Sequence, residues 1–477
     1  MLQIHYNRVS FARPVLFLVL WLALVALVAC SSGGDDPPDN GGTSSGGGNP
    51  SISSSSGGGT SSAGGGNSSG GGGTSSGGGV SSSGGGNPGS SGSVDVNVEN
   101  AIKIEFKSGS APVITNSFSE VTINPTGENV VIRIPDAPDD KEPKYNFVIS
   151  GTTSNGSVKF YGNARKSLYL NGVNITNSTG PAINIQGGKR VNVHLVNGTT
   201  NFLTDGPNYS TPPTGEQAKG TFFSEGKLEF NEGNGTLEVK GKNNHAIVVD
   251  NGFEINSGKI IVKESVNDGI HVNDKIEVKG GEIDITSVGD GIQSEKKAES
   301  QNVPQVKITG GKIKILTTGN KSHGIASDSG AVSIESNAVI QINVKGDGSK
   351  GIRARGWIQF KGGNTTIETN GEADSSDSSA DESNATGIKL TGDLFIDGGE
   401  LTVKTTKDGA KGINTEGDAT ISGGKINIDA IDNGLKVQKT LKITGGTGSI
   451  KSKKKKAIDA KEWDNNEGSI TIQNGVS

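Results

Sequence analysis

Short runs in which apolar and polar residues alternate recur about every 22 residues over the C-terminal half of the chain. Residues 267–270 read Asn-Asp-Gly-Ile, residues 280–285 read Gly-Gly-Glu-Ile-Asp-Ile, and residues 289–292 open the next unit with Gly-Asp-Gly-Ile. Alternation with a period of two is typical of β-strands, and the Gly pairs are typical of turns. Each unit therefore predicts three short strands separated by tight corners.

Aligned on the Gly-Ile element, the units form columns of apolar residues. The first column reads Ile247, Ile270, Ile292, Ile325, Ile352, Ile388, Ile413, Leu435 and Ile458. A second column follows the Gly-Gly turn, and a third precedes it. Self-similarity at this period predicts a solenoid whose coils stack about 4.8 Å apart. The fold class is therefore all-β, and we expect a right-handed single-stranded parallel β-helix, the hand that strand twist favours.

Two intervals in the first column are longer, at 33 and 36 residues, and they predict insertions at 295–304 and 371–384. The second insertion is acidic, which is typical of a solvated loop, although an extra cation site is an alternative. Residues 94–477 form the predicted β-helix domain. Within it, residues 94–220 repeat less regularly, and we expect them to form the first turns and a cap over one end.

The N-terminal 93 residues are not part of this fold. Residues 1–30 have a basic start and an apolar run that ends in Leu-Val-Ala-Cys, as in a lipoprotein signal peptide with a lipobox. Cys30 is the single cysteine, so we expect it to be lipidated, with sorting to the outer membrane or cell surface. Residues 31–93 are nearly all Gly and Ser and predict a disordered linker that tethers the domain.

Composition excludes some functions. The chain has 76 Gly and 4% aromatic residues, and its net charge is −5. A weakly acidic chain is a poor partner for nucleic acid, so we expect none. We expect a monomer, attached to the membrane only through the lipid on Cys30.

Several non-repetitive motifs resemble a known bacterial family. They are Leu-Asn-Gly-Val-Asn-Ile-Thr at 170–176, Gly-Pro-Ala-Ile at 180–183, Phe-Ser-Glu-Gly at 223–226 and the repeated Asp-Gly-Ile turns. Together they resemble the carbohydrate-binding domain family of the clostridial cellulose- and pectin-binding β-helix protein, over roughly residues 95–477. The resemblance implies a pectate-lyase-like solenoid that binds calcium, acidic plant polysaccharide such as polygalacturonate, and cellulose. It implies no established catalytic activity.

Acidic residues at one corner predict a calcium site. Asp268 and Asp290 occupy the same position in consecutive units, and stacked carboxylates repel unless a cation lies between them. Three residues after the column isoleucines come Asp250, Glu295 and Asp328, which would contribute further oxygen ligands. The alternative is that Asp-Gly is simply favourable turn chemistry.

In later units basic residues occupy the equivalent positions or those of their outward neighbours. They are Lys350, Arg353, Arg355, Lys389, Lys411 and Lys436. Stacking predicts a basic stripe along which an anionic polysaccharide could lie. The alternative is an ordinary surface of mixed charge. We expect His271 and His323 to be surface residues, because none of the histidines shows zinc-ligand spacing or a catalytic partner in sequence.

Three functions follow from these patterns. The first is a surface-tethered, calcium-dependent protein that binds acidic polysaccharide, with cellulose as a further ligand, and has no catalytic activity. The second is a polysaccharide lyase, which needs calcium and an unprotonated Lys or Arg as base. The third is a structural adhesin or spacer. Retention on polygalacturonate, and ultraviolet absorbance from an unsaturated product, separate the three.

Overall fold

The computed structural model describes residues 96–138, 143–295, 304–374, 384–465 and 468–474. Every regular element in these ranges is a β-strand. No helix among the described residues is long and apolar enough to cross a membrane. The predicted signal peptide, Cys30 and the Gly/Ser linker lie outside the described residues. The strands all belong to one compact unit, Ser83–Ser477.

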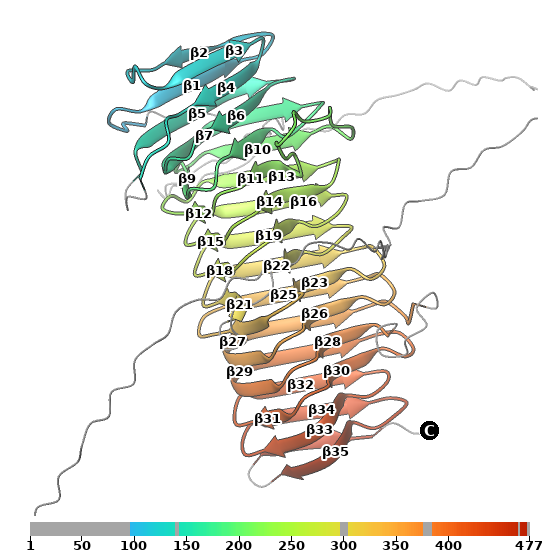
Figure 1. Cartoon of the computed structure of the whole chain (residues 1–477). Helices are drawn as coiled ribbons and strands as arrows, with labels where there is room; N and C mark the ends of the chain where they lie inside the picture. Colours follow the sequence, from blue (N-terminus) through green and yellow to red (C-terminus); the bar gives the residue numbers. More distant parts are fainter. Residues whose placement is uncertain (1–95, 139–142, 296–303, 375–383, 466–467, 475–477) are drawn as a thin grey trace, which may run out of the picture. The chain divides into compact units, whose positions relative to one another are not determined.

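The N-terminal end of the described chain is built from two antiparallel hairpins. They pair β1 (Ile102–Lys107) with β2 (Ser110–Thr115), and β3 (Thr122–Thr126) with β4 (Asn129–Arg133). Strands β1 and β4 then pair in parallel with β5 (Tyr145–Thr153) and β6 (Ser157–Tyr161). The hairpins thus join the first coil through ordinary ladders, at the end of the stack shown in blue in Figure 1.

From β5 onward the strands pair in parallel with the next coil, in three series that we call sheets 1, 2 and 3. Sheet 1 contains β4, β6, β8 (Ile183–Gln186), β11 (Gly220–Ser224), β14 (His245–Val249), β17 (Ile270–Val272), β20 (Ile292–Ser294), β23 (His323–Ser327), β26 (Lys350–Ala354), β28 (Thr386–Leu390), β30 (Lys411–Thr415), β33 (Leu435–Ile443) and β35 (Ile458–Asn465). Sheet 2 contains β5, β7 (Lys166–Asn177), β9 (Val191–Leu195), β12 (Leu228–Phe230), β15 (Phe253–Ile255), β18 (Ile276–Val278), β21 (Pro304–Ile308), β24 (Ala331–Ile334), β27 (Ile358–Thr369), β29 (Leu394–Thr405), β31 (Ala419–Ile421), β33 and β35. Sheet 3 contains β7, β10 (Thr200–Asp205), β13 (Thr236–Gly241), β16 (Lys259–Ser265), β19 (Glu282–Ser287), β22 (Lys312–Thr317), β25 (Val339–Val344), β27, β29, β32 (Lys425–Ala430), β34 (Thr447–Ser452) and β36 (Ser469–Gln473). Long strands such as β27 and β29 pass through a corner and belong to two sheets (Figure 1).

The register confirms the predicted columns and the parallel β-helix. Ile247 pairs with Ile270, and the same alignment continues coil by coil to Ile458. The two longer intervals do not disturb it, since Ile292 still pairs with Ile325 and Ile352 with Ile388. The described coils on either side of each interval therefore keep their register, and residues 296–303 and 375–383, within the two predicted insertions, lie outside the described ranges.

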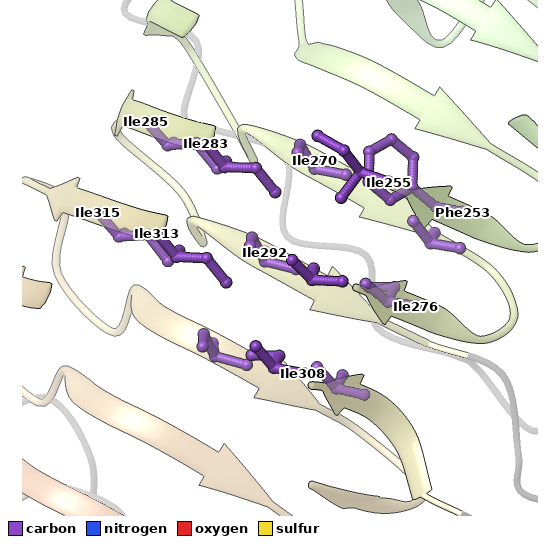
Figure 2. Packing of buried hydrophobic residues seen from close by; sticks show 14 of the residues in the cluster. Phe253, Ile255, Ile270, Ile276, Ile283, Ile285, Ile292, Ile308, Ile313 and Ile315 are labelled. Atoms are coloured by element: carbon purple, nitrogen blue, oxygen red, sulfur yellow. The ribbon is translucent and has the colours of Figure 1, made fainter. Parts of the chain in front are cut away.

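The core is a stack of aliphatic side chains from all three sheets. Ile270 and Ile292 from sheet 1, Ile283 from sheet 3 and Ile276 from sheet 2 are at most 1% exposed. Figure 2 shows the stacking between successive coils, with Ile270 over Ile292 and Ile283 over Ile313. Because every coil repeats the same inward positions, burial is continuous along the stack. This core holds the outer residues of neighbouring coils in fixed alignment.

Glycine is required at the corners for two different reasons. Gly281 has a φ of 72°, in the left-handed region that side chains other than glycine rarely adopt. Gly291 lies in an Asp-Gly-Ile turn, where an added Cβ would stand 2.4 Å from Cγ2 of Ile315. The first glycine permits a turn and the second permits close stacking on the next coil.

Candidate metal centre on sheet 1

Residues that precede the inward isoleucines of sheet 1 form a column at one corner, which we call the corner column. It reads His245, Asp268, Asp290, His323, Lys350, Thr386 and Lys411. Backbone bonds between consecutive coils hold it in line, as when the N–H of Gly269 donates to the carbonyl of Asp290. Its members lie far apart in sequence and become neighbours only because the coils stack on one another.

Asp268 is the centre of this column. Its Oδ1 accepts the backbone N–H of Asp290 at 2.8 Å, which fixes the carboxylate. Its Oδ2 lies 3.1 Å from Nδ1 of His245 and 2.9 Å from Nδ1 of His271. Nδ1 of His245 also accepts the backbone N–H of Asp268 over 3.2 Å. The ligand-type atoms of the three side chains all lie within 4.8 Å of one another, so they are suitably placed to hold one metal ion.

Two hydrogen-bonded chains support this cluster from the outer face of sheet 1. Gln293 places Oε1 2.9 Å from Nδ1 of His271 and donates from Nε2 to Asp328, which Arg353 pairs in turn. On the other side, Nε2 of His271 lies 3.2 Å from Oδ1 of Asn273. Asn273 donates to Asp250, whose carboxylate is paired with Lys219.

The cluster opens into a depression of about 400 Å³. Its lining includes the cluster, Asp290, Gln293, Glu295 and the turn 320–322. Sheet 1 is covered in the coils before it, because Gln186 donates to the carbonyl of Gln217 and the outward side chain of Phe223 is fully buried.

Burial and charge act in opposite directions on the two aspartates. Burial alone would raise the pKa of Asp268, but the adjacent His245 and His271 imidazoles and the backbone N–H of Asp290 hold that pKa well below its usual range. Burial raises the pKa of Asp290 well above its usual range, and the adjacent charge of Asp268 adds to the shift. Burial also opposes protonation of His271, yet its hydrogen bond to Asp268 leaves the His271 pKa raised. A single negative charge thus concentrates on Asp268 and faces two imidazoles.

The structure brings together only part of the predicted calcium ligands. Asp268 and Asp290 are adjacent, and Oε2 of Glu295 lies 3.5 Å from Nε2 of His271. Asp250 and Asp328 are instead engaged with Lys219 and Arg353. Calcium takes six to eight oxygen ligands, whereas two of the nearest donors at Asp268 are imidazole nitrogens. The donor set at this point does not fit calcium.

The expectation that His271 and His323 are surface residues is wrong. His271 and His323 are only 9% and 8% exposed. Nδ1 of His271 faces Asp268 and Gln293, and Nδ1 of His323 accepts the backbone N–H of Lys350. Sequence reasoning also missed His245 and Gln293. The available signal was register: His245 aligns with Asp268, and Gln293 pairs with His271 in the parallel ladder.

The six predicted basic residues do lie on consecutive coils beyond the cluster. Lys350, Lys389 and Lys411 are buried, Arg353 and Lys436 are half-buried, and Arg355 is exposed. Lys350 donates to the carbonyl of Gly348, and Lys389 pairs with Glu416 at 2.6 Å. The stripe therefore consists mainly of paired cations beneath the surface, with Arg355 as its exposed member.

Comparison with known proteins adds a family and two relatives. The model of a family described as "Carbohydrate-binding domain-containing protein" matches residues 140–412 and 407–477. A protein of that description from Acetivibrio thermocellus is 33% identical over 120 residues, which is 24% of this chain and 42% of the relative's length. A solved structure described as "polysaccharide lyase-like protein from C. thermocellum", a gadolinium derivative, aligns with 21% identity and a TM-score of 0.41, covering 65% of this chain and 98% of that one.

Proposed function

Because this chain belongs to the carbohydrate-binding domain family, we propose that it binds polysaccharide along the outer face of sheet 1 and favours acidic glycans such as polygalacturonate. One observation supports the preference for acidic chains: basic residues of successive coils lie on one face of sheet 1, where Arg353 and Lys436 are half-buried and Arg355 is exposed. Coils repeat about every 4.8 Å, so the cations follow the direction of an extended polymer. Charged groups arranged in this way attract and orient a polyanion.

Affinity electrophoresis tests the proposal, with the protein run through gels containing polygalacturonate or a neutral cellulose derivative. We expect retardation by polygalacturonate that weakens as salt is added, since exposed charges are screened. Arg355→Gln should weaken retention about two- to five-fold, the effect of losing one exposed ionic contact. The matched control is Lys314→Gln, which removes an exposed cation from sheet 3. Equal retention in both gels, or equal effects of the two substitutions, would argue against this surface.

Calcium dependence is a separate part of the proposal. We place calcium between uronate carboxylates and the half-exposed Glu295 rather than at Asp268, because an all-oxygen shell can form there from polymer and protein together. Adding EGTA should reduce retention on polygalacturonate, and calcium should restore it. Retention that ignores both additions would remove calcium from the proposal while leaving acidic-glycan binding in place.

The tether is also a proposal, supported by the lipobox and the Gly/Ser segment of the sequence. A diacylated Cys30 would hold the domain at the outer membrane or cell surface, with residues 31–93 as a flexible spacer. Labelling cells with a radioactive fatty acid should mark the protein, and Cys30→Ala should abolish the label. A labelled variant would exclude lipidation at this residue.

A further inference from the structure

At the cluster around Asp268, hydrogen-bond acceptor atoms outnumber the N–H groups that could donate to them. Gln293 donates its amide N–H to Asp328 at 2.6 Å, so its oxygen must be the atom that faces His271. The Asn273 amide is oriented in the same way by Asp250, so its oxygen accepts from Nε2 of His271. In the neutral ring the proton is then on Nε2, and the Nδ1 lone pair points at two oxygens.

The same excess is present at His245. Its Nδ1 accepts the backbone N–H of Asp268 and therefore carries no proton, yet it lies 3.1 Å from Oδ2 of Asp268. Four electron-rich atoms thus converge: one nitrogen from each ring, the Asp268 carboxylate oxygen and the Gln293 amide oxygen. Such atoms repel one another unless a cation lies between them.

We propose that His245, Asp268 and His271, with the amide oxygen of Gln293, form a binding site for a first-row transition dication of the zinc class. Imidazole and carboxylate are the ligands that these metals prefer. Two ligands about 2.1 Å from one ion and 90–110° apart lie about 3.0–3.4 Å from each other. The observed nitrogen–oxygen separations of 2.9 and 3.1 Å are close to that range. On binding, the metal replaces the long hydrogen bond that His245 accepts.

The surroundings have the features of a supported metal site. The second nitrogen of His271 is hydrogen-bonded to Asn273, which fixes the ring and its tautomer, as outer partners of metal-bound histidines do. Oδ1 of Asp268 is held by the backbone of the next coil. The depression of about 400 Å³ in front of the cluster leaves room for water or a small anionic ligand on the metal.

The competing explanation is a doubly protonated His271 paired with Asp268, which would supply the positive charge without a metal. Isothermal titration of the untagged, chelator-treated protein with ZnCl₂ at pH 7.5 distinguishes the two. We expect one equivalent of Zn²⁺ to bind, with Ca²⁺ and Mg²⁺ unable to displace it. Zn²⁺ that does not bind, or that calcium displaces, would overturn the proposal. The measurement uses no polysaccharide, so its outcome is independent of the proposed function.

Variants locate the site. His271→Ala and His245→Ala should each weaken Zn²⁺ binding by at least 100-fold, and the outer-partner variant Asn273→Ala by about 10- to 100-fold. His194→Ala is the matched control, because His194 stacks on Tyr169 away from the cluster and its loss should not change binding. Unchanged binding in His271→Ala would place the metal elsewhere.

A spectrum of the unmodified protein covers the case in which a histidine variant does not fold. Titration with Co²⁺ should produce visible d–d absorption bands that saturate at one equivalent and disappear when Zn²⁺ is added. Bands identical to those of Co²⁺ in buffer would contradict ligation by imidazole.

Discussion

Adjacent residues of β16 offer a direct test of the coil geometry. Ile260 points inward, is fully buried and pairs with Leu237 and Ile283 of the neighbouring coils. Ile261 points outward, is half-buried and pairs with Glu238 and Asp284. Replacement by alanine removes the same three carbon atoms from both positions. Only the direction of the side chain differs.

The expected magnitudes follow from burial. At Ile260 the transfer of three buried carbon groups is worth about 2.4 kcal/mol, at about 0.8 kcal/mol each. The neighbouring coils are fixed by their ladders and cannot collapse into the space, so the cavity raises the cost to about 3–4 kcal/mol. At Ile261 solvent and neighbouring side chains fill the gap, and we expect less than about 1 kcal/mol.

Urea unfolding followed by circular dichroism measures the two variants against the wild type. Native-state hydrogen exchange adds local information, because a solenoid is stabilised by contacts between nearest neighbours. Ile260→Ala should accelerate exchange in β13, β16 and β19, while Ile261→Ala should leave it close to wild type. Losses that agree within about 0.5 kcal/mol would refute the assignment of inward and outward positions.

Three further predictions concern single positions. Gly291→Ala should destabilise by about 1–3 kcal/mol in urea, because the added methyl group meets the next coil, whereas Gly188→Ala, with open space around it, should be neutral within about 0.5 kcal/mol. Although burial favours the neutral form of Glu254, hydrogen bonds from two lysines lower its pKa from 4.5 to about 2. Its contribution to stability is therefore present above pH 4.5 and is lost as the pH falls toward 2. The stabilities of Glu254→Gln and wild type, measured over a pH series, should converge near pH 2, and a constant difference would contradict the pairing. Burial lowers the pKa of Lys166 to about 8, and its ammonium has no hydrogen-bond partner among the described residues. The wild type should therefore gain stability between pH 8 and 10.5. Lys166→Met should be more stable than wild type by about 1–3 kcal/mol at pH 7 and should lack that rise, and a less stable variant would show that the amine is needed.

The candidate site separates what pattern can predict from what it cannot. Equivalent positions in consecutive units predicted that Asp268 and Asp290 would be adjacent, and the hydrogen bond from the backbone N–H of Asp290 to the Asp268 carboxylate confirms it. The same reasoning, applied to His245, would have aligned it with Asp268. It could not have shown that His271, on the next strand, also turns its Nδ1 toward that carboxylate, because this depends on side-chain rotation within the corner.

The basic stripe likewise shows that the sequence predicts the position of a residue on the coils but not the exposure of its side chain. Stacking predicted that Lys350, Lys389 and Lys411 would fall on neighbouring coils, and their strands do pair. Whether a lysine at such a position reaches solvent depends on the local partner, and Lys389 is buried beside Glu416. Charge counted along a sequence therefore overstates the charge that a ligand meets.

By itself, the sequence determined the coil: its period, its inward columns, its glycine corners and the register that survives two insertions. These features depend on the local alternation of apolar and polar residues and on similar residues recurring in each unit. Each coil therefore carries the information that sets its register on the preceding coil. The tertiary structure alone decided the chemistry of the corner, because the Gln293 amide is oriented by Asp328, which lies 35 residues away in sequence and follows β23 of the next coil. Orientation of that kind depends on contacts between side chains of different coils, and no periodic pattern encodes them.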